Sequence, residues 1–179
     1  MTSLARIAAV MLLALATTGC VTMNVATHLD RTANFTEFKT WDWGPADEFP
    51  TGDPRLDNNP FFHDYLQGAM EQELGRRGYV RADDGQWPDL LLHYHANVNQ
   101  RFQVIEPDVS CTPGNCEARV IEYEQGTIVV DMVNARTNKL VWRGWAQDSL
   151  QGIIDNQDRM EAHIEEAVTK MMAAFPRVN

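Results

Sequence analysis

The side chains of residues 90–98 alternate in character, and this alternation limits what the chain can fold into. Successive side chains of a β-strand point to opposite faces of a sheet. One face of such a strand carries Leu90, Leu92, Tyr94, Ala96 and Val98. The other face carries Leu91, His93, His95 and Asn97. The segment therefore predicts a strand that buries its first face and leaves the face with the histidines polar and solvated.

Several other segments have the composition of strands, because they combine β-branched and aromatic residues and are bounded by turn formers. These segments lie around residues 21–28, 35–43, 120–124, 126–134 and 140–147. Residues 134–139 read as a hairpin turn between the last two strands. The stretch before residue 60 is rich in Pro, Gly, Asp and Asn, which predicts an irregular loop there.

Two helices complete the prediction. Asn59 can cap a first helix, Pro60 suits its first position, and Gly78 supplies a stop. A second helix begins after Asp155 or Asn156 and ends before Pro176. The resulting order is strands, helix, adjacent strands and helix. We therefore expect an α+β fold, with a mainly antiparallel sheet covered on one face by two helices.

Residues 1–20 have the pattern of an export signal. Arg6 precedes an apolar run over residues 7–16, which is too short to span a bilayer. The sequence Thr17-Thr18-Gly19-Cys20 resembles the bacterial lipobox, although Thr17 replaces the usual aliphatic residue. We predict a lipoprotein signal peptide over residues 1–19 and a single α+β domain over residues 20–179, lipid-anchored at Cys20. One alternative is an ordinary secretory signal. Another is an uncleaved membrane helix, which the short apolar run disfavours.

The lipid anchor predicts a place in the cell envelope. Val21 would follow the acylated cysteine, and the absence of Asp there resembles an outer-membrane sorting pattern, with the domain facing the periplasm. Arg6 is the one charged residue in 1–19, so its removal changes the net charge from −10 to −11. An acidic surface repels phosphates, which excludes nucleic acid as an expected partner. The expected partners are the membrane and other envelope proteins.

Five motifs spread over most of the mature chain resemble one known family. They are Phe35-x-x-Phe38-Lys39-Thr40-Trp41-x-Trp43, Leu74-x-x-x-Gly78-Tyr79, Pro88-Asp89-Leu90-Leu91, Gly126-Thr127-Ile128-Val129-Val130-Asp131 and Asn138-Lys139-Leu140-Val141-Trp142-Arg143-Gly144. Their order and spacing resemble the bacterial lipoprotein family catalogued as domain of unknown function 4136. The resemblance implies an envelope lipoprotein with an α+β domain. It carries over no catalytic residue.

His93 and His95 are candidates for a metal site, because residues two apart on a strand share a face. A third ligand would have to come from a neighbouring strand, with Asp131 and Glu122 as candidates. Two ligands do not make a site, so no metal is predicted. Asp131 lies within an apolar strand, where it is either a catalytic acid with a raised pKa or the partner of a cation such as Arg143.

The function predicted from the sequence is an accessory or interaction module without enzymatic activity or cofactor. The sequence contains no nucleophile elbow, phosphate-binding loop, zinc-protease motif or dinucleotide fingerprint. One alternative is a hydrolase that acts on an envelope component with Asp131. Another is a small-molecule or metal binder that uses His93 and His95. Most tryptophans are expected in the core or at strand ends, with Trp142 and Trp145 on opposite faces of one strand.

The sequence also predicts a disulfide between Cys111 and Cys116. The chain has three cysteines, and lipid takes Cys20. Export places the other two in an oxidising compartment, and the turn formers between them let the chain double back. A bond that closes so small a loop is worth about 2 kcal/mol in the chain-entropy model, enough to pin a loop and too little to support the domain.

Mass spectrometry of the exported, non-reduced protein checks this bond. We expect no free thiol at Cys111 or Cys116 after rapid alkylation. Replacement of both by serine should loosen the loop and leave the global unfolding midpoint nearly unchanged. Two alkylated thiols in carefully trapped protein would contradict the prediction.

Overall fold

The computed structural model describes residues 23–45, 51–105 and 119–178. The signal peptide, Cys20, Cys111 and Cys116 lie outside the described residues. The described elements, in chain order, are β1 (Asn24–Leu29), η1 (Phe35–Glu37), β2 (Thr40–Trp43), α2 (Pro54–Asp57), α3 (Pro60–Arg76), β3 (Val80–Arg81), β4 (Leu90–Ile105), β5 (Arg119–Asn134), β6 (Lys139–Ser149) and α4 (Gln157–Met172).

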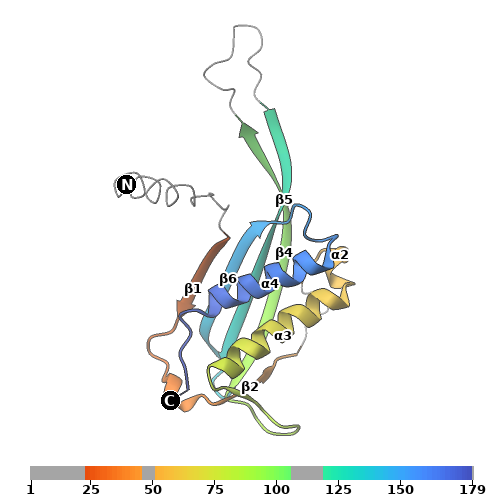
Figure 1. Cartoon of the computed structure of the whole chain (residues 1–179). Helices are drawn as coiled ribbons and strands as arrows, with labels where there is room; N and C mark the ends of the chain where they lie inside the picture. The colour runs from red at the N-terminus through yellow and green to blue at the C-terminus, as the bar shows by residue number, and fades with distance from the viewer. Residues whose placement is uncertain (1–22, 46–50, 106–118, 179) are drawn as a thin grey trace, which may run out of the picture.

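The strands form one six-stranded sheet in the order β1-β6-β5-β4-β2-β3 (Figure 1). The pairs β1–β6, β6–β5 and β5–β4 are antiparallel, whereas β2 pairs parallel with both β4 and β3. The predicted α+β class is confirmed, but the sheet is mixed rather than mainly antiparallel. The parallel pairs arise because α2 and α3 carry the chain from the end of β2 back to the start of β3, and parallel neighbours need such a crossover.

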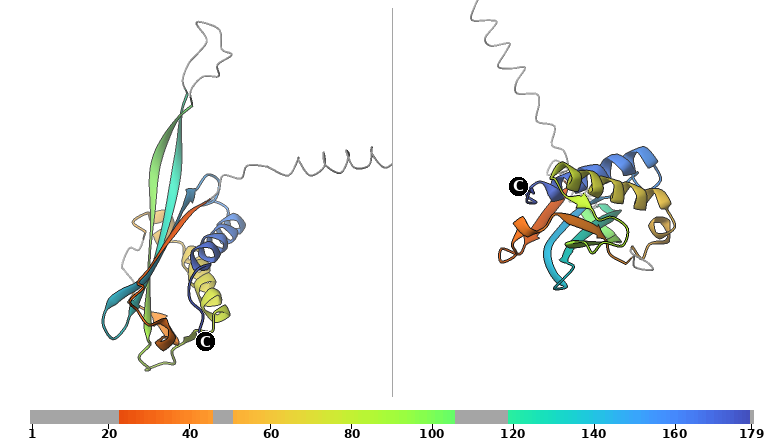
Figure 2. Two further views of the ribbon diagram at one scale, coloured as in Figure 1. Left: turned by 90° about the vertical axis from the view of Figure 1, so that its left-hand side faces the viewer. Right: turned by 90° about the horizontal axis from the view of Figure 1, so that it is seen from below.

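α3 and α4 lie side by side against the same face of the sheet (Figures 1 and 2). The Asn59 side chain accepts a hydrogen bond from the Phe61 amide and caps α3, and Asn156 caps α4 in the same way. Gly78 has a φ of 87°, the left-handed conformation that ends a helix after α3. Among the described helices, none has both the length and the apolar character needed to cross a bilayer.

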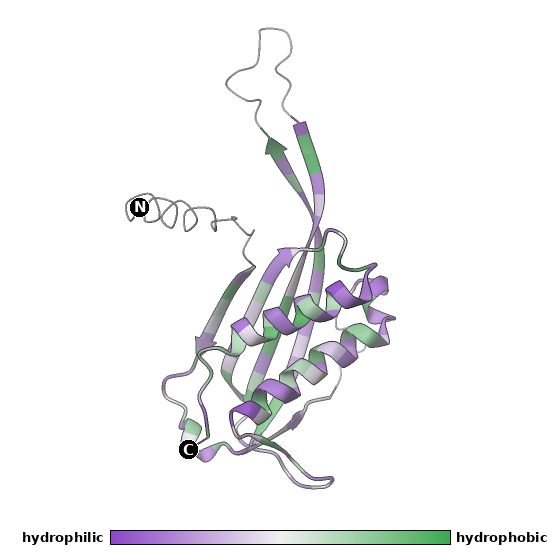
Figure 3. Ribbon diagram, viewed as in Figure 1, coloured by the Kyte–Doolittle hydropathy of each residue, from purple (hydrophilic) through white to green (hydrophobic). Residues whose placement is uncertain are grey.

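The hydrophobic core lies between these helices and the sheet. Figure 3 colours the ribbon by the hydropathy of each residue. The burial of Leu90, Leu92 and Ala96 confirms the face of β4 predicted to point inward. Their partners in the core include Leu66, Met70 and Leu74 from α3, Val168 and Met171 from α4, and Val130, Met132 and Trp142 from the sheet. The helices therefore hold the sheet through apolar contacts with the part of its inner face that they cover.

Residues 35–43 were expected to form one strand and do not. The Asn34 side chain accepts a hydrogen bond from the Thr36 amide at 3.3 Å and starts η1 instead. The rings of Phe35 and Phe38 then meet edge to face, with centroids 5.4 Å apart. Local capping and aromatic packing thus outweigh β-propensity here, and the strand begins only with β2.

The predicted strands over residues 120–124 and 126–134 are one continuous strand. β5 pairs with β4 at every position from Leu90–Asn134 to Ile105–Arg119. Gly126 does not interrupt this ladder, because it faces Val98 in register. A Cβ atom at Gly126 would lie 2.8 Å from the Leu150 side chain, so glycine leaves the space that Leu150 occupies.

A buried ion pair joins the C-terminal ends of α3 and α4. Arg77 donates hydrogen bonds to the carboxylate of Glu73 and, at 2.6 Å, to the carbonyl oxygen of Met172 in α4. Arg76 donates a further bond to Glu73 at 2.8 Å. Burial by itself raises the pKa of Glu73, but the bonds and charges of Arg77 and Arg76 outweigh it and hold that pKa below its usual value.

We expect Glu73→Gln to lower the free energy of unfolding by about 3 kcal/mol at pH 7, because it leaves the buried Arg77 without a countercharge. Urea titration measures the change. Since the pKa of Glu73 is lower in the folded chain, its contribution is present above the ordinary carboxylate range and is lost as pH falls through the lowered value.

Glu166→Gln is the matched control. Lys170 and Glu166 form a pair with the same spacing along α4, but both side chains are largely exposed. Its loss should change the free energy of unfolding by less than about 0.5 kcal/mol. An equal decrease in the free energy of unfolding in the two variants would show that the buried Glu73 pair stabilises the fold no more than an exposed pair does.

Candidate functional site

The sheet face opposite α3 and α4, called the outer face below, carries a row of polar side chains. The cross-strand register places His93 of β4 opposite Asp131 of β5, and Asp131 opposite Arg143 of β6. Arg143 lies opposite His28 of β1 in turn. Four strands thus contribute one ionisable residue each to a line across the sheet. Side chains directly opposite one another on antiparallel strands are close enough to interact.

Asp131 is bound by Arg143 in this row. Arg143 donates from Nε to one carboxylate oxygen at 2.6 Å and from a terminal nitrogen to the other at 2.5 Å. Asp131 is only 9% exposed, and its hydrogen bonds and negative charge raise the pKa of Arg143. Asp131 was expected to be either a catalytic acid or the partner of a cation such as Arg143, and in the structure it forms the ion pair. Both of its carboxylate oxygens are therefore already used in hydrogen bonds to Arg143.

His93 and His95 share the outer face, but they have different surroundings. The ring of His93 rests on Gly44, where an added Cβ atom would lie 2.1 Å from ring carbon Cε1. His95 is exposed and lies opposite Val129, one row further along the sheet. The close packing on Gly44 gives His93 a structural role at the end of β2.

The two proposed third ligands are placed differently. Asp131 is directly opposite His93, but Arg143 holds both of its oxygens. Glu122 lies opposite Phe102, far along the ladder from His93 and on the other face. Within residues 23–45, 51–105 and 119–178, no group of three or more His, Cys, Asp or Glu side chains is arranged to hold a metal ion.

Trp142 and Trp145 occupy opposite faces of β6, as predicted. Trp142 is buried in the core, where its ring meets Phe175 edge to face at 5.4 Å. Gly144 lies against it, because a Cβ atom there would come within 2.4 Å of the Trp142 ring. Trp145 is half-buried on the outer face beside the polar row. Trp87, in the loop before β4, is almost fully exposed.

A small cavity lies between the sheet and α4 and has a volume of about 50 Å³. Apolar side chains, including Met23, Ala96 and Ile164, form most of its wall. Its ionisable residues are His163 and Asp148, whose nearest nitrogen and oxygen are 3.8 Å apart. The volume has room for a few water molecules and not for a substrate of ordinary size.

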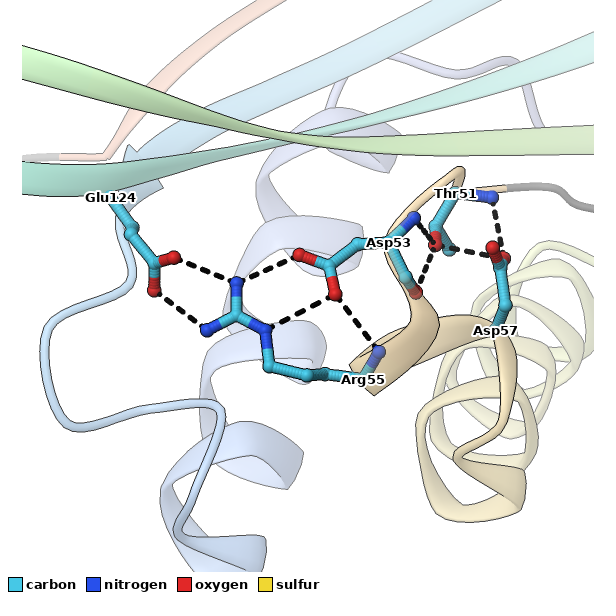
Figure 4. Close-up of polar contacts among 5 residues, drawn as sticks. All are labelled: Thr51, Asp53, Arg55, Asp57 and Glu124. Carbon is cyan, nitrogen blue, oxygen red and sulfur yellow. Dashed lines mark hydrogen bonds and ion pairs between the residues drawn. The ribbon is translucent and has the colours of Figure 1, made fainter.

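A cluster around Arg55 connects α2 to the middle of β5 (Figure 4). Arg55 donates two hydrogen bonds to Glu124, at 2.7 and 3.0 Å, and also bonds both carboxylate oxygens of Asp53. The bond from Arg55 lowers the pKa of Asp53. Thr51 and Asp57 bond to each other behind this pair and shape the loop. Sequence reasoning missed the cluster, because Arg55 and Glu124 are 69 residues apart and neither belongs to a motif.

The sequence matches the family model of a domain of unknown function, DUF4136, over residues 25–177. No curated protein matches it. Solved structures with a similar fold include a DUF4136 family protein from Bacteroides thetaiotaomicron, with a TM-score of 0.55 and 15% identity. That alignment covers 84% of this chain and 94% of the other.

A PDZ domain protein from Parabacteroides distasonis is also similar, with a TM-score of 0.54 and 14% identity. The alignment covers 88% of this chain but only 37% of the Parabacteroides protein, so this chain corresponds to about a third of that protein's length. At these identities, the likeness shows a shared fold and nothing about activity.

The Arg55 cluster should restrain β5 beyond the point where β6 ends. We expect Arg55→Ala to speed amide hydrogen exchange over residues 119–124 about fivefold, which corresponds to about 1 kcal/mol for a half-exposed ion-pair network. Arg81→Ala is the control, because Arg81 also bonds two carboxylates but lies on β3. Exchange in this segment that responds equally to both variants would exclude a tethering role for Arg55.

Proposed function

The chain belongs to the DUF4136 family, and on that premise we propose that it is a lipid-anchored protein of the bacterial envelope, held at Cys20. In this proposal the domain faces the periplasm from the outer membrane. It acts there as an accessory module that binds other envelope components and catalyses no reaction.

The position of Met23 is the observation that carries the proposal. Met23 is only 8% exposed and belongs to the hydrophobic core, and β1 begins at the next residue. Only Val21 and Thr22 separate it from the lipobox cysteine. An acylated Cys20 would therefore hold the folded domain directly at the membrane, without the flexible linker that a freely ranging domain would have.

The chemistry of the described residues supports a binding role rather than catalysis. Asp131 is the acid that the sequence analysis named for a hydrolase, and both of its carboxylate oxygens are bound by Arg143. The outer face instead offers a broad polar surface with Trp145 among its residues, a composition suited to contact with another macromolecule.

The anchor is tested with a chain in which a cleavable secretory signal replaces residues 1–19, so that processing does not depend on acylation. With Cys20 intact behind its own signal, we expect the mature protein in the membrane fraction and an acylated N-terminal peptide by mass spectrometry. With Cys20→Ser behind the secretory signal, we expect it in the soluble periplasmic fraction.

Cys111→Ser behind the native signal is the control and should remain acylated and membrane-bound. The proposal fails if the protein carrying Cys20 has no acyl mass. It also fails if the processed Cys20→Ser protein partitions with membranes as completely as the lipidated one.

A further inference from the structure

The outer ends of β4 and β5 form a two-stranded ribbon that projects beyond the rest of the sheet (Figures 1 and 2). We call this ribbon the arm and define it as Arg101–Ile105 of β4 with Arg119–Tyr123 of β5, which pair in register. β6 ends at Ser149, opposite Gln125, and β2 pairs with β4 only over Leu90–Leu92. Within the described residues, the arm therefore has no third strand beside it.

The arm exposes apolar side chains on both of its faces. Phe102, Val104 and Val120 are on one face, where Glu122 lies opposite Phe102, and Ile105 and Ile121 are on the other. Phe102 is 67% exposed. A ribbon of two strands is marginally stable in water on its own, and a contiguous exposed apolar patch marks a surface that binds something. The arm thus has the character of a contact surface.

The expected lipid is attached at the end of the sheet from which the arm leaves. Asn24, the first residue of β1, lies in a cross-strand row with Gln147, Thr127 and Asn97. Cys20 is three residues before Met23, so it is at most about 11 Å from it. The arm extends to Ile105, eight residues beyond Asn97 in the same direction, which is about 26 Å of strand. It therefore reaches further than the tether does.

These lengths bear on whether a bilayer can reach the arm's apolar surface. Three residues are too few to carry the lipid around to the opposite end of the sheet, where β3 lies. A membrane that holds the lipid is therefore within reach of the arm. Glu122 lies opposite Phe102 on the arm, and a carboxylate is costly in hydrocarbon. This favours an arm that lies along the headgroup boundary over one that crosses it.

We infer that the arm rests in the surface of the bilayer that holds the Cys20 lipid, with Phe102 and its apolar neighbours at the acyl boundary. The inference rests on the proposed lipidation at Cys20. The contact is apolar, so it does not need anionic lipid and does not weaken with salt. It gives the domain a second attachment and a fixed orientation on the membrane.

The test uses the full mature lipoprotein, purified from membranes and reconstituted into phosphatidylcholine vesicles with or without brominated acyl chains. Phe102→Trp adds a fluorophore to the arm. Val80→Trp is the matched control, because Val80 is 64% exposed and lies in β3 at the other end of the sheet. The emission of the five native tryptophans is subtracted with the unchanged protein. A Val104→Trp variant repeats the arm measurement at a second position.

We expect bromine to reduce the added emission of Phe102→Trp and Val104→Trp about twofold, since the acyl boundary lies within about 5–10 Å of the surface. The added emission of Val80→Trp should not change, and 0.5 M salt should not relieve the quenching. Quenching no greater than that of Val80→Trp, in protein whose acyl mass is verified, overturns the inference and leaves the proposed anchor intact. Unquenched arm emission that shifts to the blue with protein density in the vesicle also overturns it, because a second copy then covers the arm. Absence of the acyl mass refutes the anchor itself.

Discussion

The pairing of β4 with β5 is the interaction on which the rest of the structure depends. The ladder runs without a break from Leu90–Asn134 to Ile105–Arg119. In its first half, the alternation of side chains divides the sheet into an inner face that packs under the helices and an outer face with the polar row. In its second half, the same ladder continues after its neighbours have ended and becomes the arm. One register therefore sets the core, the outer face and the exposed ribbon.

Two arginine–carboxylate pairs fix the positions of helices that the strand pairing alone does not determine. Arg77 and Glu73 are buried, and the hydrogen bond that Arg77 donates to the carbonyl oxygen of Met172 fixes α3 against α4, so that the inner face stays covered. Arg55 and Glu124 are half-exposed and fix α2 against β5 where the arm begins. The buried pair has the greater effect on stability, because a lone charge in the core is costly. The exposed pair acts on a segment with few other contacts, so its effect should be local.

The parts of the fold that depend on local chemistry could be predicted, and those that depend on distant partners could not. The alternation over residues 90–98 identified the inner face of β4, and Asn59 and Gly78 marked the two ends of α3. The parallel pairing of β2 was not visible, because no residue in it signals which strand will be its neighbour. The bond between Arg55 and Glu124 was equally hidden, since each looks like an ordinary surface charge in the sequence.

The distribution of charge limits the kinds of interaction by which such a domain could bind a membrane or a partner. The chain is strongly acidic, and many of its arginines are bound to carboxylates within the domain, namely Arg55, Arg76, Arg77, Arg81, Arg136 and Arg143. A guanidinium held in an ion pair contributes little field to attract phosphate headgroups at a distance. Under the proposal that the domain is held at a membrane, long-range attraction to anionic lipid would therefore contribute little to its affinity. The proposed contacts are instead apolar, namely the lipid expected on Cys20 and the exposed side chains of the arm, and both would act at any ionic strength.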